Sequence, residues 1–137
     1  MNKFIVWYSN DINEDKFSME FSLQELIAQD HLDYVSDSKQ LVNYKVDSIN
    51  NGIGLKDINN KKIYTDSSIV EFKHKTLVDK VIGYFTFAND EYLRYEIKIL
   101  RINPSVKNKD NFVFAKSLFS DIKIIDTIQE NKLGLIK

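Results

Sequence analysis

The 137-residue chain contains no cysteine, one proline, four glycines, two histidines and two arginines. The absence of cysteine excludes disulfide bonds, thiol catalysis and cysteine-ligated metal sites. No apolar run approaches the length that spans a membrane, and the chain does not open with a basic-then-apolar leader. We therefore expect a cytoplasmic protein with no membrane partner.

Charge of one sign does not dominate either: the formal net charge is −1. The charges are, however, unevenly distributed along the chain. Residues 1–50 carry four lysines and nine acidic residues, which gives −5. Residues 51–137 carry fifteen basic and eleven acidic residues, which gives +4. A total close to zero gives no general attraction to nucleic acid, because that affinity comes from neutralised phosphates. The lysine-rich part leaves room for a local basic patch.

What the chain does contain is enough apolar material for a globular core. Hydrophobic residues make up 43% of the sequence and aromatic residues 12%, in a chain long enough to bury most of them. We expect a single domain over residues 1–137. It divides into an N-terminal portion, 1–53, and a β-barrel-like portion, 54–137.

The N-terminal portion is predicted to hold a strand and one short helix. Residues 3–9, KFIVWYS, mix β-branched and aromatic side chains, as strands do. Ser22 and Glu25 have the spacing of a capping box, which predicts a helix over about 22–31. A weaker alternation within residues 40–49 allows a second strand. The apolar residues expected on one face of the helix are Met19, Leu23, Leu26 and Ile27.

From residue 54 onward the pattern is β almost throughout. Strands are predicted where apolar and polar residues alternate, with Val70 and Phe72 facing inward. The alternation slips by one residue near Ile99 and Leu100, which predicts a β-bulge there. The fold class is therefore mainly β, with a small, strongly bent barrel or sheet. The further strands are expected at 81–87 and 92–102, joined by a hairpin loop at 88–91, and at 112–114 and 121–126.

Residues 54–72, GLKDINNKKIYTDSSIVEF, place an apolar pair between two turns. Gly54 is expected to have a positive φ. Residues 57–60 and 65–68 are rich in Asp, Asn and Ser, which favour turns. We predict that Ile63 and Tyr64 are buried between these turns. We also predict that 69–73 is a strand paired on at least one side.

The same stretch resembles the signature of the YopX-like family of phage and prophage proteins. Residues 3–8, including Trp7, are similar to that family's N-terminal strand, and residues 122–136 resemble its C-terminal segment. The chain departs from the family pattern at Asn60, where the family has glycine. It departs again at 65–68, where TDSS replaces a glycine-aspartate segment and is one residue longer. The residues that match the signature are Gly54, Leu55, Lys56, Asp57, Asn59, Lys62, Ile63, Tyr64, Ile69 and Val70.

The resemblance implies a β-rich phage protein, located in the cytoplasm of an infected or lysogenic bacterium. It brings no catalytic residues, because none are assigned to the family's motif. No other sequence pattern indicates an enzyme: there is no glycine-rich phosphate loop and no nucleophile elbow. We therefore expect a protein that is not an enzyme and that has no cofactor.

The histidines and the paired carboxylates have structural explanations. His74 is predicted to cap the core at a strand end. His31 is predicted to follow the helix, where the dipole favours an imidazolium. Two isolated histidines without cysteine do not make a zinc site. The carboxylate pairs, Asp90 with Glu91 and Asp126 with Glu130, fall at a hairpin and at a strand end.

Two function classes remain open. The first is an accessory protein that binds a host or phage protein, including host defence or regulatory machinery, with Trp7 as a candidate anchor. The second is a nucleic-acid-binding accessory factor that uses the lysine-rich half. The scarcity of arginine, whose fork suits phosphate, favours the first. Unprotected strand edges and the uneven charge also predict a homo-oligomer. The candidate basic surface consists of Lys56, Lys61, Lys62, Lys73 and Lys75.

Overall fold

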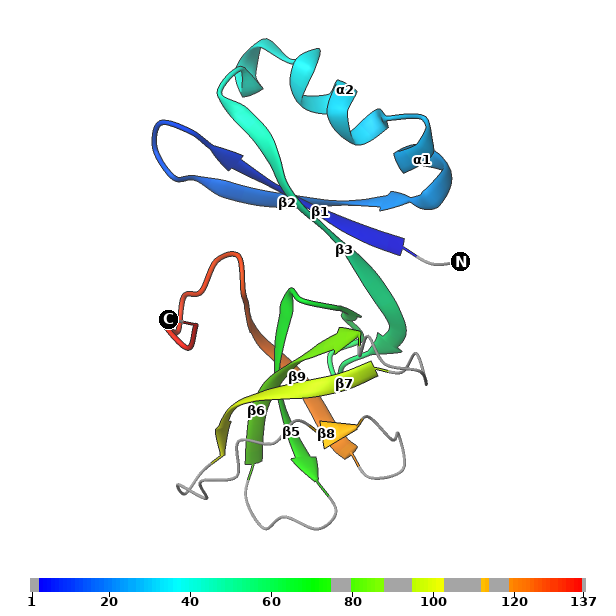
Figure 1. Ribbon diagram of the computed structural model, residues 1–137, viewed down its shortest axis with the longest axis vertical. Coiled ribbons are helices and arrows are strands. Elements are labelled where there is room, and N and C mark those ends of the chain that lie inside the picture. Colours follow the sequence, from blue (N-terminus) through cyan, green and yellow to red (C-terminus); the bar gives the residue numbers. More distant parts are fainter. Residues whose placement is uncertain (1–2, 75–79, 88–94, 103–111, 114–118, 137) are drawn as a thin grey trace. The chain divides into compact units, whose positions relative to one another are not determined.

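The computed structural model describes residues 3–74, 80–87, 95–102, 112–113 and 119–136 (Figure 1). These residues form a mainly β structure with a few short helices, which confirms the predicted fold class. They belong to two compact units, Met1–Ile53 and Gly54–Lys137. No helix within the described ranges is long and apolar enough to cross a membrane.

The first unit is built on antiparallel strands, with β1 in the middle. β1 and β2 pair without interruption from Lys3 opposite Ser22 to Ser9 opposite Lys16. The pairing of β1 with β3 contains a bulge between Trp7 and Tyr8. The predicted first strand is confirmed, whereas β2 was not predicted. The strands are β1 (Lys3–Asn10), β2 (Lys16–Ser22) and β3 (Tyr44–Lys56).

Two short helices follow β2, so the prediction of one helix over 22–31 is wrong. They are α1 (Leu23–Ile27) and α2 (Asp30–Ser36), and a 3₁₀ turn, η1 (Lys39–Leu41), comes next. The predicted capping box is confirmed: the Glu25 amide donates to Ser22 Oγ at 3.1 Å, and the Ser22 amide donates to Glu25 Oε1 at 2.9 Å. Gln29 then adopts a left-handed conformation, with φ 64°, which separates the two helices.

The core of the first unit shows why the helical spacing was misleading. Val6, Tyr8 and Phe21 are buried, and Met19 and Leu26 pack against them. Met19 reaches this core from a strand, so the apolar periodicity spans two elements. Leu23 and Ile27, expected beside Leu26 on the buried face, are instead 54% and 73% exposed. Further partly buried side chains against this core are Phe17, Val35, Tyr44 and Val46.

Tyr8 joins the sheet of the first unit to its helices. Its ring stacks on Phe17, with the centroids 4.9 Å apart, and its hydroxyl donates to the backbone carbonyl of His31 at 2.8 Å. Burial and, second, the neighbouring Tyr34 raise the pKa of Tyr8 to about 12. The fold therefore favours the neutral phenol.

Tyr8→Phe is expected to destabilise the first unit by about 1 kcal/mol at neutral pH, because one buried hydrogen bond is lost.

The raised pKa of Tyr8 also predicts a loss of stability in alkali. A phenol with a folded-state pKa above its unfolded value of about 10 contributes stability that is complete below that value. This contribution disappears as the pH rises through about 12. Urea unfolding at neutral and alkaline pH should therefore show a smaller alkaline loss in Tyr8→Phe. Equal losses in both proteins would contradict this assignment, since lysine titration is common to both.

The second unit contains a five-stranded antiparallel sheet in the order β8-β7-β6-β5-β9. β5 pairs with β6 on one side and with β9 on the other. In the described part of the chain the outer strands, β8 and β9, do not pair, so of the barrel or sheet expected over 54–137 the structure has the open sheet and not a closed barrel. The strands are β5 (Ser68–His74), β6 (Lys80–Phe87), β7 (Tyr95–Ile102), β8 (Phe112–Val113) and β9 (Phe119–Thr127). A further strand, β4 (Lys62–Tyr64), is last in the other sheet, ordered β2-β1-β3-β4.

The predicted bulge in β7 is confirmed. Ile82 lies opposite Arg101, whereas the next residue, Gly83, lies opposite Ile99. Leu100 is therefore the extra residue that absorbs the slip in the sequence pattern. The hairpin loop predicted at 88–91 lies outside the described residues, as does the loop that contains the single proline.

The two predictions for residues 54–72 are also confirmed. Ile63 and Tyr64 are buried, and β5 is paired on both sides. Val70 and Phe72 are fully buried, as the alternation predicted, while Lys73 is exposed. Other fully buried side chains in this unit are Ile69, Val81, Phe85 and Ile97.

Candidate functional site

Asp57 fastens the loop after β3 to β9. Its Oδ1 accepts hydrogen bonds from the amides of Asn59 and Lys61, both at 2.9 Å, and its Oδ2 accepts one from the amide of Ile124 at 3.0 Å. Burial raises the pKa of Asp57, but the backbone donors of Ile124, Lys61 and Asn59 outweigh burial and lower it below its ordinary value. All three bonds go to backbone within the fold, so this carboxylate has a structural role.

The turns around Asp57 have the predicted backbone conformations. Gly54 and Asn60 have φ values of 79° and 65°, so Asn60 occupies the left-handed region at the position of the family's glycine. Asp66 also has a positive φ, 51°, within the TDSS stretch that departs from the family pattern. Ser67 then bonds the C-terminal segment: its hydroxyl donates to Gln129 Oε1 at 2.8 Å. The signature stretch and the C-terminal segment therefore hold each other in place.

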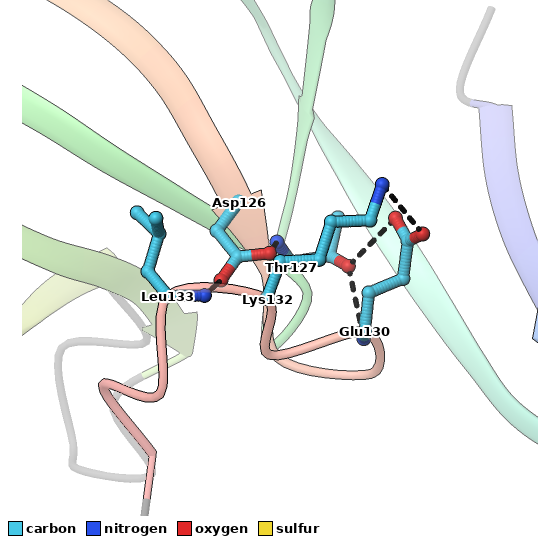
Figure 2. A network of polar contacts seen from close by, with 5 residues as sticks. All are labelled: Asp126, Thr127, Glu130, Lys132 and Leu133. Atoms are coloured by element: carbon cyan, nitrogen blue, oxygen red, sulfur yellow. Dashed lines mark hydrogen bonds and ion pairs between the residues drawn. The ribbon is translucent and has the colours of Figure 1, made fainter.

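The carboxylates of Asp126 and Glu130 close a turn after β9 (Figure 2). Asp126 accepts from the amides of Thr127 and Leu133, at 2.8 and 2.9 Å. Glu130 accepts from the Thr127 hydroxyl at 3.4 Å and pairs with Lys132 at 3.2 Å. These contacts agree with the structural role expected at a strand end, because each carboxylate is bound by neighbouring residues of the turn.

The two histidines lie in different units. His74 lies at the end of β5 with its ring edge-on to Phe119, at a centroid distance of 5.0 Å, as predicted for a residue that caps the core. The prediction for His31 is wrong: it is the second residue of α2, near the helix N-terminus, and it is buried. Among the described residues, no group of three or more His, Asp or Glu side chains could hold a metal ion.

The candidate basic surface is interleaved with acidic residues. Lys73 pairs with Asp121 at 3.5 Å, and Lys80 pairs with Glu71 at 3.2 Å. Lys56, Lys61 and Lys62 are exposed in and beside the loop that Asp57 holds, and Lys75 lies outside the described residues. Trp7, the candidate anchor, is only 3% exposed, so its indole is not presented to a partner in this structure.

A different surface, on the helices of the first unit, combines apolar and acidic side chains. Leu23 and Ile27 project from α1 one turn apart, and Leu32 and Tyr34 of α2 are more than 40% exposed. Phe21 and Tyr34 line a shallow groove of about 460 Å³ together with Asp30, Asp33, Asp37 and Ser38. We call this the helical surface; it consists of Leu23, Ile27, Asp30, Leu32, Asp33, Tyr34 and Asp37.

The acidic residues of the helical surface share one side of α2, because 30, 33 and 37 follow helical spacing. No lysine or arginine in the described ranges forms an ion pair with them. Sequence reasoning missed this surface, although two signals were available. One was the −5 charge of residues 1–50, and the other was the helical spacing of Leu23 and Ile27.

Comparisons with protein-family models, with curated proteins and with solved structures find no match to this chain. Two candidate surfaces remain, the helical surface and the loop that carries Lys56, Lys61 and Lys62, and they differ in the groups they expose. The helical surface offers exposed apolar side chains, and carboxylates that form no ion pair with a described lysine or arginine. The loop offers three exposed lysines, whereas Lys73 of β5 is paired with Asp121.

Proposed function

We propose that this chain is a phage- or prophage-encoded accessory protein that binds a host or phage protein and catalyses no reaction. The observation that carries the proposal is the helical surface. The large apolar side chains of α1 and α2 are exposed there, and three carboxylates of the α2 region line a groove with Tyr34. Exposed apolar patches with a polar rim are typical of protein interfaces. The phage origin is supported by the resemblance of three segments to the YopX-like family. Host defence or regulatory machinery is the partner class that this origin suggests.

The exposed apolar side chains of α1 offer a partner two adjacent anchor positions. Leu23 and Ile27 lie at i and i+4, so one partner pocket can cover both. Complete burial of such a side chain contributes about 1.5–3 kcal/mol. The carboxylates of Asp30, Asp33 and Asp37 select a partner with basic groups at the rim and speed its association. Affinity and selectivity would thus come from different residues of one surface.

The second candidate is a nucleic-acid-binding accessory factor. It is favoured by the exposed lysines of the loop at 54–62, where Lys56, Lys61 and Lys62 are close in sequence. Against it stand the ion pairs of Lys73 and Lys80 with neighbouring acidic residues. We place it second for this reason.

The decisive experiment compares two multiple-substitution variants in bacteria that carry the phage. Tagged wild-type protein, Leu23→Asp/Ile27→Asp, and Lys56→Gln/Lys61→Gln/Lys62→Gln are purified, and the bound proteins are quantified by mass spectrometry. We expect one or a few proteins to be enriched with the wild type and the lysine variant, and lost with the double Asp variant. Both substituted sites are exposed, so unfolding curves should confirm an intact fold in each variant.

The same variants test the second candidate by titration with duplex DNA and single-stranded RNA. Nucleic-acid binding through lysines must weaken linearly with the logarithm of salt concentration, because each neutralised phosphate releases counterions. Submicromolar, salt-sensitive binding that the lysine variant loses would replace the first proposal with the second. Retention of the captured protein by Leu23→Asp/Ile27→Asp would also contradict the role of the helical surface.

A further inference from the structure

The pairing register of β6 and β7 determines which of their side chains share a face of the second sheet. Residues directly opposite each other in an antiparallel pair point to the same side of the sheet. Tyr84 lies opposite Lys98, and Ile82 lies opposite Arg101. Since Ile82 and Tyr84 are two positions apart in β6, all four side chains are on one side. Lys98 and Arg101 are exposed, and Ile82 and Tyr84 are partly exposed.

The bulge at Leu100 brings Arg101 to this side. In a regular strand Lys98 and Arg101 would point to opposite faces, because they are three positions apart. The extra residue in β7 reverses the alternation, so Arg101 is exposed beside Ile82. The alternate residues of β6 are buried, and without the bulge the guanidinium of Arg101 would point to their side of the sheet. The bulge thus gathers two cations on one face.

β5 and β9 extend the same face. Glu71 of β5 lies opposite Ile82 on one side and opposite Lys123 of β9 on the other. One row of side chains therefore crosses four strands, from Lys123 to Arg101. Three strand spacings separate its ends, about 14 Å, so these two cations can bind separate anionic groups. We call this the sheet face; it consists of Glu71, Ile82, Tyr84, Lys98, Arg101 and Lys123.

The charges of the sheet face favour an anionic ligand. Glu71 is paired with Lys80 at 3.2 Å. Within the described ranges, no ion pair joins Lys98, Arg101 or Lys123 to an acidic residue. Glu96 is the next residue of β7 on this side after Lys98. Even with Glu96 and Lys80 included, four basic residues stand against two acidic ones.

Tyr84 places an aromatic ring beside these cations. A ring among cations is the arrangement that binds single-stranded nucleic acid, because bases stack on the ring while phosphates bind the cations. In a duplex the faces of the bases are covered by neighbouring bases, so the ring would have no partner. An acidic protein segment would bind the cations, but it would not need Tyr84.

We propose that the second unit binds single-stranded nucleic acid on the sheet face, with a base stacked on Tyr84 and phosphates bound by Lys98, Arg101 and Lys123. The planar fork of arginine matches a phosphate group. Few cations take part, so the affinity should be roughly micromolar at low salt. This activity goes beyond the proposed protein binding and does not depend on it, because the helical surface belongs to the other unit.

Substitutions of Tyr84 test the stacking. Fluorescence anisotropy is measured with labelled oligothymidine and oligouridine of about 12 nucleotides, with a duplex DNA of the same length, and with polyglutamate as a competitor. Tyr84→Phe should bind as the wild type does, whereas Tyr84→Leu should bind both single strands about tenfold more weakly. In Tyr84→Trp, the single strands should quench the fluorescence of the new indole and polyglutamate should not. The native Trp7 is buried and supplies a constant background.

Charge substitutions test which cations bind phosphate. Lys98→Gln/Arg101→Gln/Lys123→Gln should reduce the slope of log affinity against log salt by about 2, since each phosphate neutralised on a single strand contributes about 0.7. The matched control is Lys56→Gln/Lys61→Gln/Lys62→Gln, which removes the same charge from the same unit. The control should keep the slope and stay within about threefold of the wild-type affinity.

Four results would overturn the proposal. They are no binding of either single strand at low salt, tighter binding of the duplex or of polyglutamate, equal losses in the two triple variants, and no quenching in Tyr84→Trp. Unfolding curves confirm that each variant is folded, and the quenching decides if Tyr84→Leu is not. None of these results affects the capture of a protein through Leu23 and Ile27, so the two proposals fail independently.

Discussion

Asp57→Ala is expected to destabilise the second unit by about 3–6 kcal/mol, because three backbone amides inside the fold lose their acceptor at once. A buried donor left without a partner costs about 1–3 kcal/mol, and the lower part of that range applies because all three bonds are partly buried. The lost bonds are those from Asn59, Lys61 and Ile124. The last of them joins residues 67 positions apart, so the loop would also separate from β9.

Asp57 also predicts how the second unit responds to acid. Its pKa is lowered in the folded state, where backbone donors outweigh burial. An acid with a lowered folded-state pKa contributes stability that is complete above its unfolded-state value, about 3.9. That contribution is lost as the pH falls through the folded-state pKa. Asp57→Asn should therefore be less stable than the wild type at neutral pH and less sensitive to acid.

Urea unfolding at neutral pH and at several acidic pH values checks both statements. The matched control is Glu71→Ala, which removes a carboxylate that pairs at the surface with Lys80. Such surface pairs contribute about 0–1 kcal/mol, so the control should unfold close to the wild type. If Asp57→Ala resembled Glu71→Ala, the three hydrogen bonds would not stabilise the unit as argued.

Gly83→Ala is expected to cost about 2–4 kcal/mol, since the bulge brings two strands too close for a side chain. A β-carbon on residue 83 would overlap the carbonyl oxygen of Lys98 and lie 2.8 Å from Ile97 Cγ2. A rigid backbone atom on one side and a core side chain on the other leave no room for a small adjustment. β6 and β7 would have to separate at the bulge.

Gly54→Ala is the informative comparison for Gly83→Ala. Gly54 has a φ of 79°, but among the described residues no non-neighbouring atom lies within 4 Å of the position where its β-carbon would be. The loss of folding stability in Gly54→Ala should therefore come only from the unfavourable backbone conformation, and should be about 1–2 kcal/mol. Thermal unfolding of both variants separates the two reasons for glycine. A loss for Gly83→Ala no larger than that for Gly54→Ala would show that β7 moves aside easily.

The sequence by itself determined the features that depend on neighbouring residues. The β-branched and aromatic content of residues 3–9 identified β1. Alternating apolar and polar side chains identified β5 and β7, because a strand turns successive side chains to opposite faces. The slip near Ile99 located the bulge at Leu100 for the same reason. Turn-forming residues around Gly54, Asn60 and Asp66 marked the conformations that such side chains tolerate.

Only the tertiary structure decided the features that depend on distant partners. Phe21 and Met19 became part of a strand because β1 pairs with them, although the spacing that included Met19 was helical. Leu23 and Ile27 remained exposed, because of the three apolar residues of α1 only Leu26 packs against the core of the first unit. Local periodicity shows which residues share a face of a helix or strand. Pairing between residues that are distant in the sequence decides whether that face is buried or exposed. The helical surface is the consequence, and no short stretch of the sequence contains the contacts that expose it.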